Sequence, residues 1–244
     1  MKKYSACGNT FLILTNFDKE IIEEQKPIFS VENSGQLDGV IFVERSEGLF
    51  LLDYFNRDGS RGEMCGNGAR SFLRFLYDKG FIAAEERTDF LTFSGKLNGL
   101  VYKNGEVRVK MPNPSDFTII ESNGRKGYFL TVGVPHFVIF TEDIESIDIE
   151  ETGRKIRYDK VFPKGTNVNF IKIIEESKIQ VRTYERGVER ETLACGTGTT
   201  ACAYIFSKTH KTGKEILAHV RGGLLKVLFE PEGFFLEGKA VRID

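Results

Sequence analysis

The sequence predicts a β-rich α+β protein, and three observations favour this class. The 244 residues include 25 Gly, 21 Phe and 8 Tyr, a composition typical of many turns and of aromatic strand positions. The segmentation indicates two rounds of short strands with one main helix in each round. Apolar runs are short, as at 11–14 and 50–52, and none approaches the roughly 20 residues of a membrane-spanning helix.

The first round is predicted to hold several strands around one helix. Strands are expected at 11–17, 37–44, 49–56, 89–93, 97–102 and 106–111, with the pair 37–44 and 49–56 forming a hairpin. A helix is predicted over 66–79, and Gly80 suits its C-terminal cap. The apolar residues at helical spacing on one face of this helix are Ala69, Phe72, Leu73, Leu76 and Tyr77.

A break is predicted at 111–114, where Pro112 and Pro114 disfavour both helix and strand ladder. This boundary gives two domains, 1–112 and 113–244. The second round is expected to have a polar helix within 142–157 and a main helix over 196–208. Its strands are predicted at 117–121, 128–134, 137–141, 167–174, 179–185, 215–220, 223–229, 234–237 and 239–243.

The two rounds share a motif, which indicates an internal duplication. Tyr54 precedes Cys65 of Cys-Gly-Asn-Gly by the same spacing at which Tyr184 precedes Cys195 of Cys-Gly-Thr-Gly. A cysteine at the first turn of a helix lies beside unpaired N–H groups and the positive end of the helix dipole, which favours the thiolate. Two such thiols suit a racemase or epimerase, which removes a proton from one face of a carbon and returns one to the other without a cofactor.

Other site chemistries fit less well. Gly196–Ala201 matches a dinucleotide fingerprint, but no βαβ unit is expected around either motif. A P-loop is excluded by the missing Gly-Lys-Ser/Thr. Zinc is disfavoured, because Cys-x-x-Cys is lacking and the available histidines are His136, His210 and His219. A Cys–His hydrolase built on His136 would leave the second motif unexplained. Cys7 and Cys202 are interpreted as ordinary buried cysteines.

The composition limits the partners and the compartment. Hydrophobic residues make up 41% and charged residues 28%, and the net charge of −1 provides no basic excess for nucleic acid. Lys2 and Lys3 precede a segment too polar for a signal peptide. We expect a cytoplasmic protein with reduced cysteines and with no membrane or nucleic-acid partner.

An ordered set of motifs runs along nearly the whole chain, at 8–9, 55–59, 65–70, 135–136, 166–170, 184–187 and 195–198. In this set the sequence resembles the diaminopimelate epimerases, which are cofactor-independent, two-cysteine enzymes of lysine and peptidoglycan precursor synthesis. The resemblance implies a small-molecule amino-acid substrate. It also implies two pseudo-symmetric domains, each a β-sheet or barrel wrapped around a central helix, with the active site in the cleft between them.

The resemblance also implies roles for individual residues. Cys65 and Cys195 would be the base and the acid, with His136 tuning the first thiol and Glu185 the second. The residues that would grip the reacting carboxylate are Asn9, Gly66, Asn67, Gly196 and Thr197. Those that would read the distal end of the substrate are Asn56, Asn167, Glu185 and Arg186.

The sequence departs from the family pattern at three positions. Thr10 stands where the family usually has Asp, Gly39 where it has Gln, and Val134 where it has Asn. Loss of two amides is expected to relax specificity, so that a simpler amino acid such as glutamate is also racemised. A racemase of another amino acid and a catalytically silent amino-acid-binding protein are the alternatives. The chain ends early relative to the family, which leaves the homodimer implied by the resemblance open.

Overall fold

The structure, a computed structural model, describes residues 1–62 and 65–243 and divides into two compact units. Unit 1 comprises Met1–Lys110 with Glu237–Asp244, and unit 2 comprises Met111–Leu236. The division differs from the predicted domain 113–244 at the C-terminus, because the last strand pairs with the first strand of unit 1. Asp244 lies outside the described residues.

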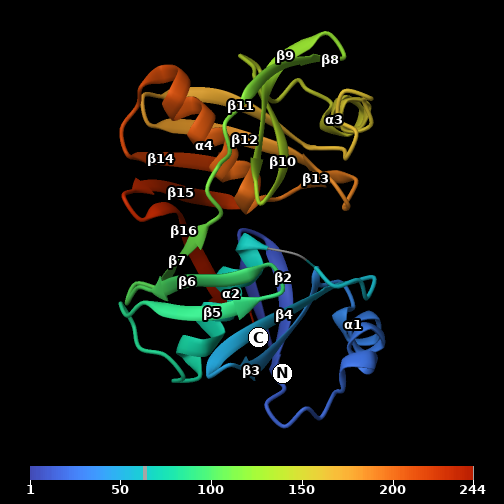
Figure 1. Cartoon of the computed structure of the whole chain (residues 1–244), viewed down its shortest axis with the longest axis vertical. Helices are drawn as coiled ribbons and strands as arrows, with labels where there is room; N and C mark the ends of the chain where they lie inside the picture. Colours follow the sequence, from blue (N-terminus) through green and yellow to red (C-terminus); the bar gives the residue numbers. More distant parts are fainter. Residues whose placement is uncertain (63–64, 244) are drawn as a thin grey trace. The chain divides into compact units, whose positions relative to one another are not determined.

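Unit 1 is a closed barrel of eight strands (Figure 1). Strand β16 (Gly233–Arg242) pairs antiparallel with β1, with Tyr4 opposite Arg242 and Ala6 opposite Ala240, and this pairing closes the order β1 to β7 and β16. The other strands are β1 (Lys2–Ala6), β2 (Asn9–Thr15), β3 (Gly39–Ser46), β4 (Leu49–Asn56), β5 (Thr88–Thr92), β6 (Gly95–Val101) and β7 (Glu106–Met111). The barrel confirms the predicted fold class, although the sequence analysis missed β1.

Helix α2 (Gly66–Asp78) fills the barrel, where it packs against β1, β2, β3, β4 and β6. The predicted apolar face is confirmed, since four of its residues are buried in the core and Tyr77 packs against it partly buried. Gly80 follows the helix with φ of +71°, a left-handed conformation that glycine adopts without strain. The core of unit 1 is therefore the contact between this helix and the inner barrel wall.

The sequence analysis missed a short 3₁₀ turn, η1 (Glu23–Gln25), and the helix α1 (Lys26–Ser34) that follows it. The buried residues of α1 are Lys26, Ser30 and Ser34, whereas its apolar Ile28 and Val31 are exposed. A search for an apolar helical stripe does not find such a helix, because its buried face is polar.

Unit 2 repeats the plan around helix α4 (Gly196–His210), which packs against β9, β10, β11, β12, β14 and β15. Its strands are β8 (Thr118–Ser122), β9 (Arg125–Val132), β10 (Val134–Phe140), β11 (Asn167–Glu175), β12 (Lys178–Glu185), β13 (Arg190–Thr192), β14 (Glu215–Val220) and β15 (Gly223–Glu230). Helix α3 (Ile149–Arg157) lies within the range predicted for the polar helix. Segments 234–237 and 239–243, predicted as two strands, form the single strand β16.

Each unit contains two parallel strand pairs, which corrects one expectation. Strands β4 and β5 are parallel and joined through α2, and β12 and β14 are parallel and joined through α4, so a βαβ unit does surround each Cys-Gly-x-Gly motif. The outer helices make the same kind of connection, α1 between β2 and β3 and α3 between β10 and β11. Antiparallel pairs flank every parallel pair, so no doubly wound dinucleotide-binding sheet is formed.

Within the described residues, no helix combines the length and the apolar character needed to cross a bilayer.

Candidate functional site

Cys65 and Cys195 occupy equivalent positions at the starts of the two central helices. Cys65 caps α2 with φ −118° and ψ 107°, and Cys195 caps α4 with φ −115° and ψ 111°. The Gly68 N–H donates to the Cys65 Sγ at 3.3 Å, and the Gly198 N–H donates to the Cys195 Sγ at 3.4 Å. A thiolate at either position would be stabilised by this N–H group and by the helix dipole.

In unit 1, buried polar side chains form a hydrogen-bonded network that includes two residues of α2, which Cys65 caps. The Arg70 Nη2 donates to the Asn67 Oδ1 at 2.5 Å, and the Asn67 Nδ2 donates to the Asn9 Oδ1 at 2.5 Å. A guanidinium only donates hydrogen bonds, so Arg70 fixes which end of the Asn67 amide faces it, and Asn67 in turn fixes Asn9. The predicted carboxylate-gripping residues Asn9 and Asn67 are thus brought together, and the Asn9 amide nitrogen is turned to donate elsewhere.

Asn56 ends β4 with its amide held in one orientation. Its Oδ1 accepts from the Tyr54 hydroxyl at 2.8 Å, and its Nδ2 donates to the Ser60 Oγ at 3.0 Å. The Asp58 carboxylate accepts from the Ser60 hydroxyl and N–H, which lowers the pKa of Asp58. The turn after β4 therefore orients Asn56 before any substrate arrives.

The structure explains why position 39 is a glycine, which the sequence analysis did not. A Cβ atom at this position would collide with the Phe55 carbonyl oxygen and with the Tyr54 ring. The Tyr54 ring fills this space, and its hydroxyl is the group that holds Asn56. At another departure from the family pattern, the Thr10 hydroxyl and N–H both donate to the Asp38 carboxylate.

His136 in unit 2 is a buried, neutral imidazole. The Thr183 hydroxyl donates to the Asn169 Oδ1 at 3.0 Å, so the Asn169 Nδ2 faces the His136 Nδ1 at 3.2 Å. Nδ1 must then accept, which assigns the ring proton to Nε2. Burial, reinforced by the charge of Arg186, lowers the pKa of His136 to about 3. Nε2 has no hydrogen-bond partner within the part of the chain that the structure describes.

Asn169 contacts the predicted site residue His136, and the sequence analysis assigned it no role. It is fully buried, and a Cβ on Gly198 would collide with its Oδ1, so its amide lies against the first turn of α4. It therefore connects His136 to the helix that Cys195 caps. The signal in the sequence was its spacing: Asn167 and Asn169 are two residues apart on one strand and share a face.

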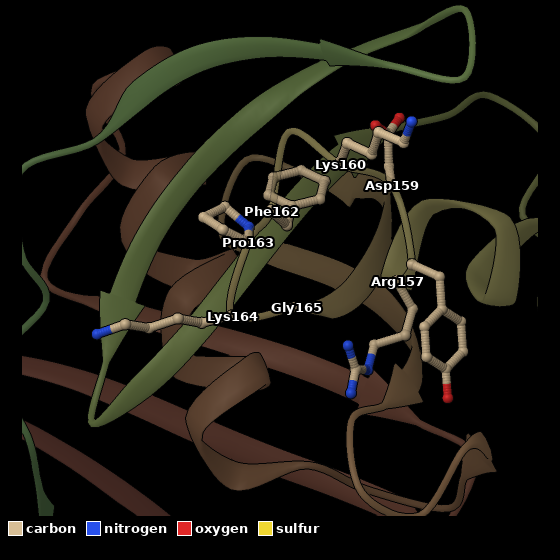
Figure 2. Close-up of a pocket in the computed structure, with 8 residues that line it drawn as sticks. Arg157, Asp159, Lys160, Phe162, Pro163, Lys164 and Gly165 are labelled. Atoms are coloured by element: carbon tan, nitrogen blue, oxygen red, sulfur yellow. The ribbon is translucent and has the colours of Figure 1, made fainter.

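Asn167 uses its amide to fix two neighbouring segments. Its Nδ2 donates to the Pro135 carbonyl at 2.9 Å, and its Oδ1 accepts from the Arg186 N–H at 2.9 Å. The Arg186 Nη1 donates to the Lys164 carbonyl at 3.1 Å. That carbonyl belongs to the wall of an open pocket of about 530 Å³, lined by residues 157–160 and 162–165, in which the Lys164 ammonium extends away from the Arg157 guanidinium (Figure 2).

The remaining predicted residues of unit 2 lie at the ends of β12 and α4. The Glu185 Oε2 accepts from the Thr192 hydroxyl at 2.8 Å. The Thr197 hydroxyl lies 3.5 Å from the Cys195 Sγ. Cys202 is buried deeper in α4, where burial raises the pKa of its thiol well above the ordinary range. The interpretation of Cys202 as a buried cysteine outside the chemistry agrees with this position.

The chain resembles known proteins along its whole length. A family model described as diaminopimelate epimerase matches residues 1–116 and 128–243. The diaminopimelate epimerase of Thermotoga maritima is 46% identical over 240 residues, which cover 98% of each chain. The diaminopimelate epimerase of Hydrogenobaculum sp. is 37% identical over 266 residues, covering 99% of this chain and 95% of that protein.

A solved structure has the same fold. The phenazine biosynthesis protein of the PhzF family from Bacillus anthracis matches with a TM-score of 0.75 at 15% sequence identity, and the match covers 100% of this chain and 96% of that one. At this level of identity the likeness concerns the fold alone.

Proposed function

The chain belongs to the diaminopimelate epimerase family of isomerases, and on that premise we propose that it inverts the α-carbon of LL-diaminopimelate to give the meso isomer. Cys65 and Cys195 transfer the protons, one as thiolate and the other as thiol, and no cofactor takes part. The observation that carries the proposal is the matched pair of cysteine helix caps, each with an N–H group on its sulfur. A reaction with free thiols suits the cytoplasm.

Charge develops on the substrate carboxylate when the α-proton leaves. The N–H groups of Gly66, Asn67, Gly196 and Thr197 belong to the first turns of the two helices, where N–H groups have no partner within the helix. We assign the reacting carboxylate to these groups and to the amide of Asn9. Donors fixed before the reaction stabilise the developing charge more than mobile water does.

Polar side chains of both units are assigned to the distal end of the substrate. Arg186 suits a carboxylate and Glu185 suits an ammonium group. Asn56 and Asn167 are already oriented by their own hydrogen bonds, which supports a role in positioning. His136 tunes the Cys65 thiol as a neutral hydrogen-bond donor, and Glu185 tunes Cys195.

We further propose that specificity is relaxed, so that a simpler amino acid such as glutamate is also racemised. Gly39 and Val134 offer no side-chain amide to the substrate, and a site with fewer obligatory polar partners rejects analogues less strongly. The Tyr54 ring against Gly39 supports this proposal, because it fills the space where a longer side chain would begin.

Solvent isotope uptake tests the proposed function. The reduced protein is incubated in heavy water with LL-diaminopimelate and, separately, with L-glutamate, L-aspartate and L-lysine. Mass spectrometry reports deuterium at the α-carbon, and chiral chromatography reports inversion. We expect both with diaminopimelate, and label in glutamate as well if specificity is relaxed. Label confined to diaminopimelate would refute the relaxed specificity alone.

Cysteine variants separate catalysis from binding. Cys65→Ala and Cys195→Ala are each expected to lower the inversion rate by at least about 10³-fold, since each removes one proton-transfer group. Cys202→Ala is the matched control, because it removes a buried thiol from the same helix as Cys195. Diaminopimelate bound without label or inversion by the wild-type protein would indicate the silent binding protein and contradict the proposed function.

A further inference from the structure

Tyr54 in strand β4 is a buried tyrosine whose ring packs against the backbone of two glycines. A Cβ on Gly39 would collide with the Cε2 edge of the ring, and a Cβ on Gly62 would collide with the Cδ1–Cε1 edge. A side chain at either position would therefore displace the ring. Close backbone contact on both edges fixes the ring and, with it, the direction of the hydroxyl.

The Tyr54 hydroxyl lies near two acceptors at the end of β4. It is 2.8 Å from the Asn56 Oδ1 and 3.5 Å from the Asp38 carbonyl oxygen. A phenol carries one proton, and the shorter distance assigns that proton to Asn56. Tyr54 and Asn56 are two residues apart on one strand, so their side chains share a face. The tyrosine therefore determines where the amide oxygen of Asn56 lies.

The nitrogen end of the Asn56 amide is fixed by hydrogen bonds that lead to a carboxylate. The Ser60 hydroxyl donates to the Asp58 Oδ1 at 2.6 Å, because an ionised carboxylate can only accept. The Ser60 oxygen therefore accepts from the Asn56 Nδ2, which lies 3.0 Å away. The backbone closes the same turn, since the Asn56 N–H donates to the Ser60 carbonyl at 2.8 Å. Both ends of the amide are thus assigned by the chemistry of their partners.

An amide fixed in this way suits recognition of an amino-acid group. A side-chain amide has two N–H groups and two lone pairs, and the contacts with Tyr54 and Ser60 use one of each. The second N–H and the second lone pair lie in the same fixed plane, where they match a carboxylate that accepts and an ammonium that donates. A side chain oriented in advance loses little conformational entropy when the ligand binds.

The duplication separates the tyrosine ring from the tyrosine hydroxyl. Tyr184 occupies the matching position in unit 2 and is buried as well, but its hydroxyl donates to the Glu189 Oε2 at 3.4 Å. Arg186 stands two residues after it, where unit 1 has Asn56. A buried tyrosine ring is therefore common to both units, whereas the hydrogen bond from the hydroxyl to the residue two positions on is recorded in unit 1.

We propose that Tyr54 and Ser60 are positioning residues that act through Asn56, holding its amide in the one orientation that recognises the distal amino-acid end of the substrate. The inference rests on the proposed function for the identity of that substrate. The orientation of the amide itself is a property of unit 1 alone. The specificity-determining group of Tyr54 is its hydroxyl, and the ring serves to place it.

Steady-state kinetics of Tyr54→Phe test the hydroxyl, because phenylalanine keeps the ring against the two glycines. The KM for LL-diaminopimelate should rise about three- to tenfold, with kcat within about twofold of the wild-type value, since one neutral hydrogen bond that acts on binding is lost. Tyr4→Phe is the matched control. It removes the hydroxyl of another buried tyrosine of the same barrel, whose partner is Asp78 at the end of α2, and should change neither constant. An unchanged KM in Tyr54→Phe, or a loss in kcat alone, would overturn the inference.

A double-mutant cycle shows whether Tyr54 acts through Asn56. In an Asn56→Ala background, Tyr54→Phe should lower kcat/KM no further, since the acceptor is already absent. Effects that multiply would mean that the hydroxyl acts elsewhere, as on the Asp38 carbonyl, and would refute the inference. Ser60→Ala should raise the KM as Tyr54→Phe does, and Ser60→Thr, which keeps the hydroxyl, should restore it. A KM that Ser60→Ala leaves unchanged would equally contradict the proposal.

A measurement without substrate separates this inference from the proposed function. Nitrogen-15 relaxation of the Asn56 side-chain amide should give an order parameter near that of rigid backbone, about 0.85, in the wild-type protein and in Tyr4→Phe. The value should fall in Tyr54→Phe and in Ser60→Ala. If that pattern is found but diaminopimelate is not inverted, the proposed function fails and the positioning of Asn56 stands. If diaminopimelate is inverted but the amide is equally ordered in all variants, the proposed function stands and this inference fails.

Discussion

Cys65 and Cys195 begin their helices with backbone angles that agree within a few degrees, yet the side chains packed around the two helices differ in kind. In unit 1 a buried guanidinium, Arg70, holds Asn67 beside the thiol. In unit 2 the first turn of α4 packs against Asn169, which contacts a neutral imidazole, His136. The duplicated backbone places the same N–H donor on the sulfur of each cysteine. The surrounding side chains differ in charge, with a guanidinium near one helix start and a neutral imidazole near the other.

The outer helices differ in a parallel way. Helix α1 turns Lys26 inward, where its Nζ lies 2.6 Å from Asp53 and 2.8 Å from both Glu23 and Glu44. Helix α3 instead buries Ile149 and Ile156 in an apolar cluster. Unit 1 therefore adds buried ion pairs to the packing of Phe29 of α1 against Phe42. Unit 2 anchors α3 chiefly by hydrophobic burial, although the two connections have the same topology.

The largest expected effect comes from breaking the ion-pair anchor. Asp53 is fully buried and binds both Lys26 and, at 2.9 Å, the Arg61 Nε. Burial alone would lower the pKa of Lys26, but its hydrogen bonds to Asp53, Glu23 and Glu44 outweigh burial and raise it. Asp53→Asn is expected to lower the free energy of unfolding by about 3 kcal/mol, because it leaves a buried cation undercompensated. Urea unfolding measures this change.

The matched control for Asp53 is an exposed ion pair in the same unit. Asp89 binds Arg87 at 3.0 Å and Lys96 at 2.8 Å near the surface, so Asp89→Asn should cost no more than about 1 kcal/mol. If Asp53→Asn and Asp89→Asn lowered the free energy of unfolding equally, the buried ion pairs of Lys26 would not stabilise α1. The contrast between the anchoring of α1 and that of α3 would then disappear.

The next largest effect is a pH dependence of stability that arises from histidine. It belongs to unit 2, because all three histidines of the chain lie after residue 111. The folded-state pKa of His136, about 3, lies below its ordinary value of 6.5. Between these values the unfolded state binds more protons, so this stability is complete above pH 6.5 and is lost as the pH falls. The free energy of unfolding should decrease by about 1.4 kcal/mol for each pH unit below about 6 from this residue.

His136→Asn isolates that contribution. The Asn side chain places an oxygen where Nδ1 accepts from Asn169, but it does not titrate. The difference in slope between the wild-type protein and the variant, measured by urea unfolding from pH 5 to 7, should approach one proton toward pH 5 and shrink toward pH 7. His219→Asn removes an exposed imidazole from the same unit and is the control. Equal slopes in wild-type protein and His136→Asn would contradict a neutral, buried His136.

Sequence periodicity and the repeated motif predicted both central helices, with the cysteines at their starts, because these helices bury regular faces. The same reasoning missed α1, whose buried Lys26 is recognised only once Asp53 and Glu44 lie beside it. The parallel pairing of β4 with β5 was missed because it joins strands that are distant in sequence. The role of Asn169 depends on Thr183 and His136, which meet it only in the folded sheet.

The smallest expected effect on stability comes from adding one Cβ atom at equivalent positions of the two central helices. Gly68 and Gly198 occupy the same position in the two motifs, and each donates its N–H to the cysteine sulfur. Among the described residues, the three atoms nearest to a Cβ on Gly68 belong to Cys65 and Ile41, at 3.4–3.6 Å, which is ordinary contact. A Cβ on Gly198 would instead displace the Asn169 amide. Gly68→Ala should therefore be neutral or stabilising by up to about 1 kcal/mol, since alanine favours helix.

Gly198→Ala should be destabilising by about 1–2 kcal/mol, because Asn169 is fully buried and is held by hydrogen bonds to Thr183 and His136. Paired urea titrations of the two variants measure the difference, and Asn169→Ala made in the Gly198→Ala background should recover part of the loss by removing the collision. If the two alanine variants changed the free energy of unfolding equally, Asn169 would accommodate a Cβ on Gly198 as easily as the surroundings of Gly68 accommodate one. The two units would then differ in the charges around the cysteines but not in how tightly the helix starts are packed.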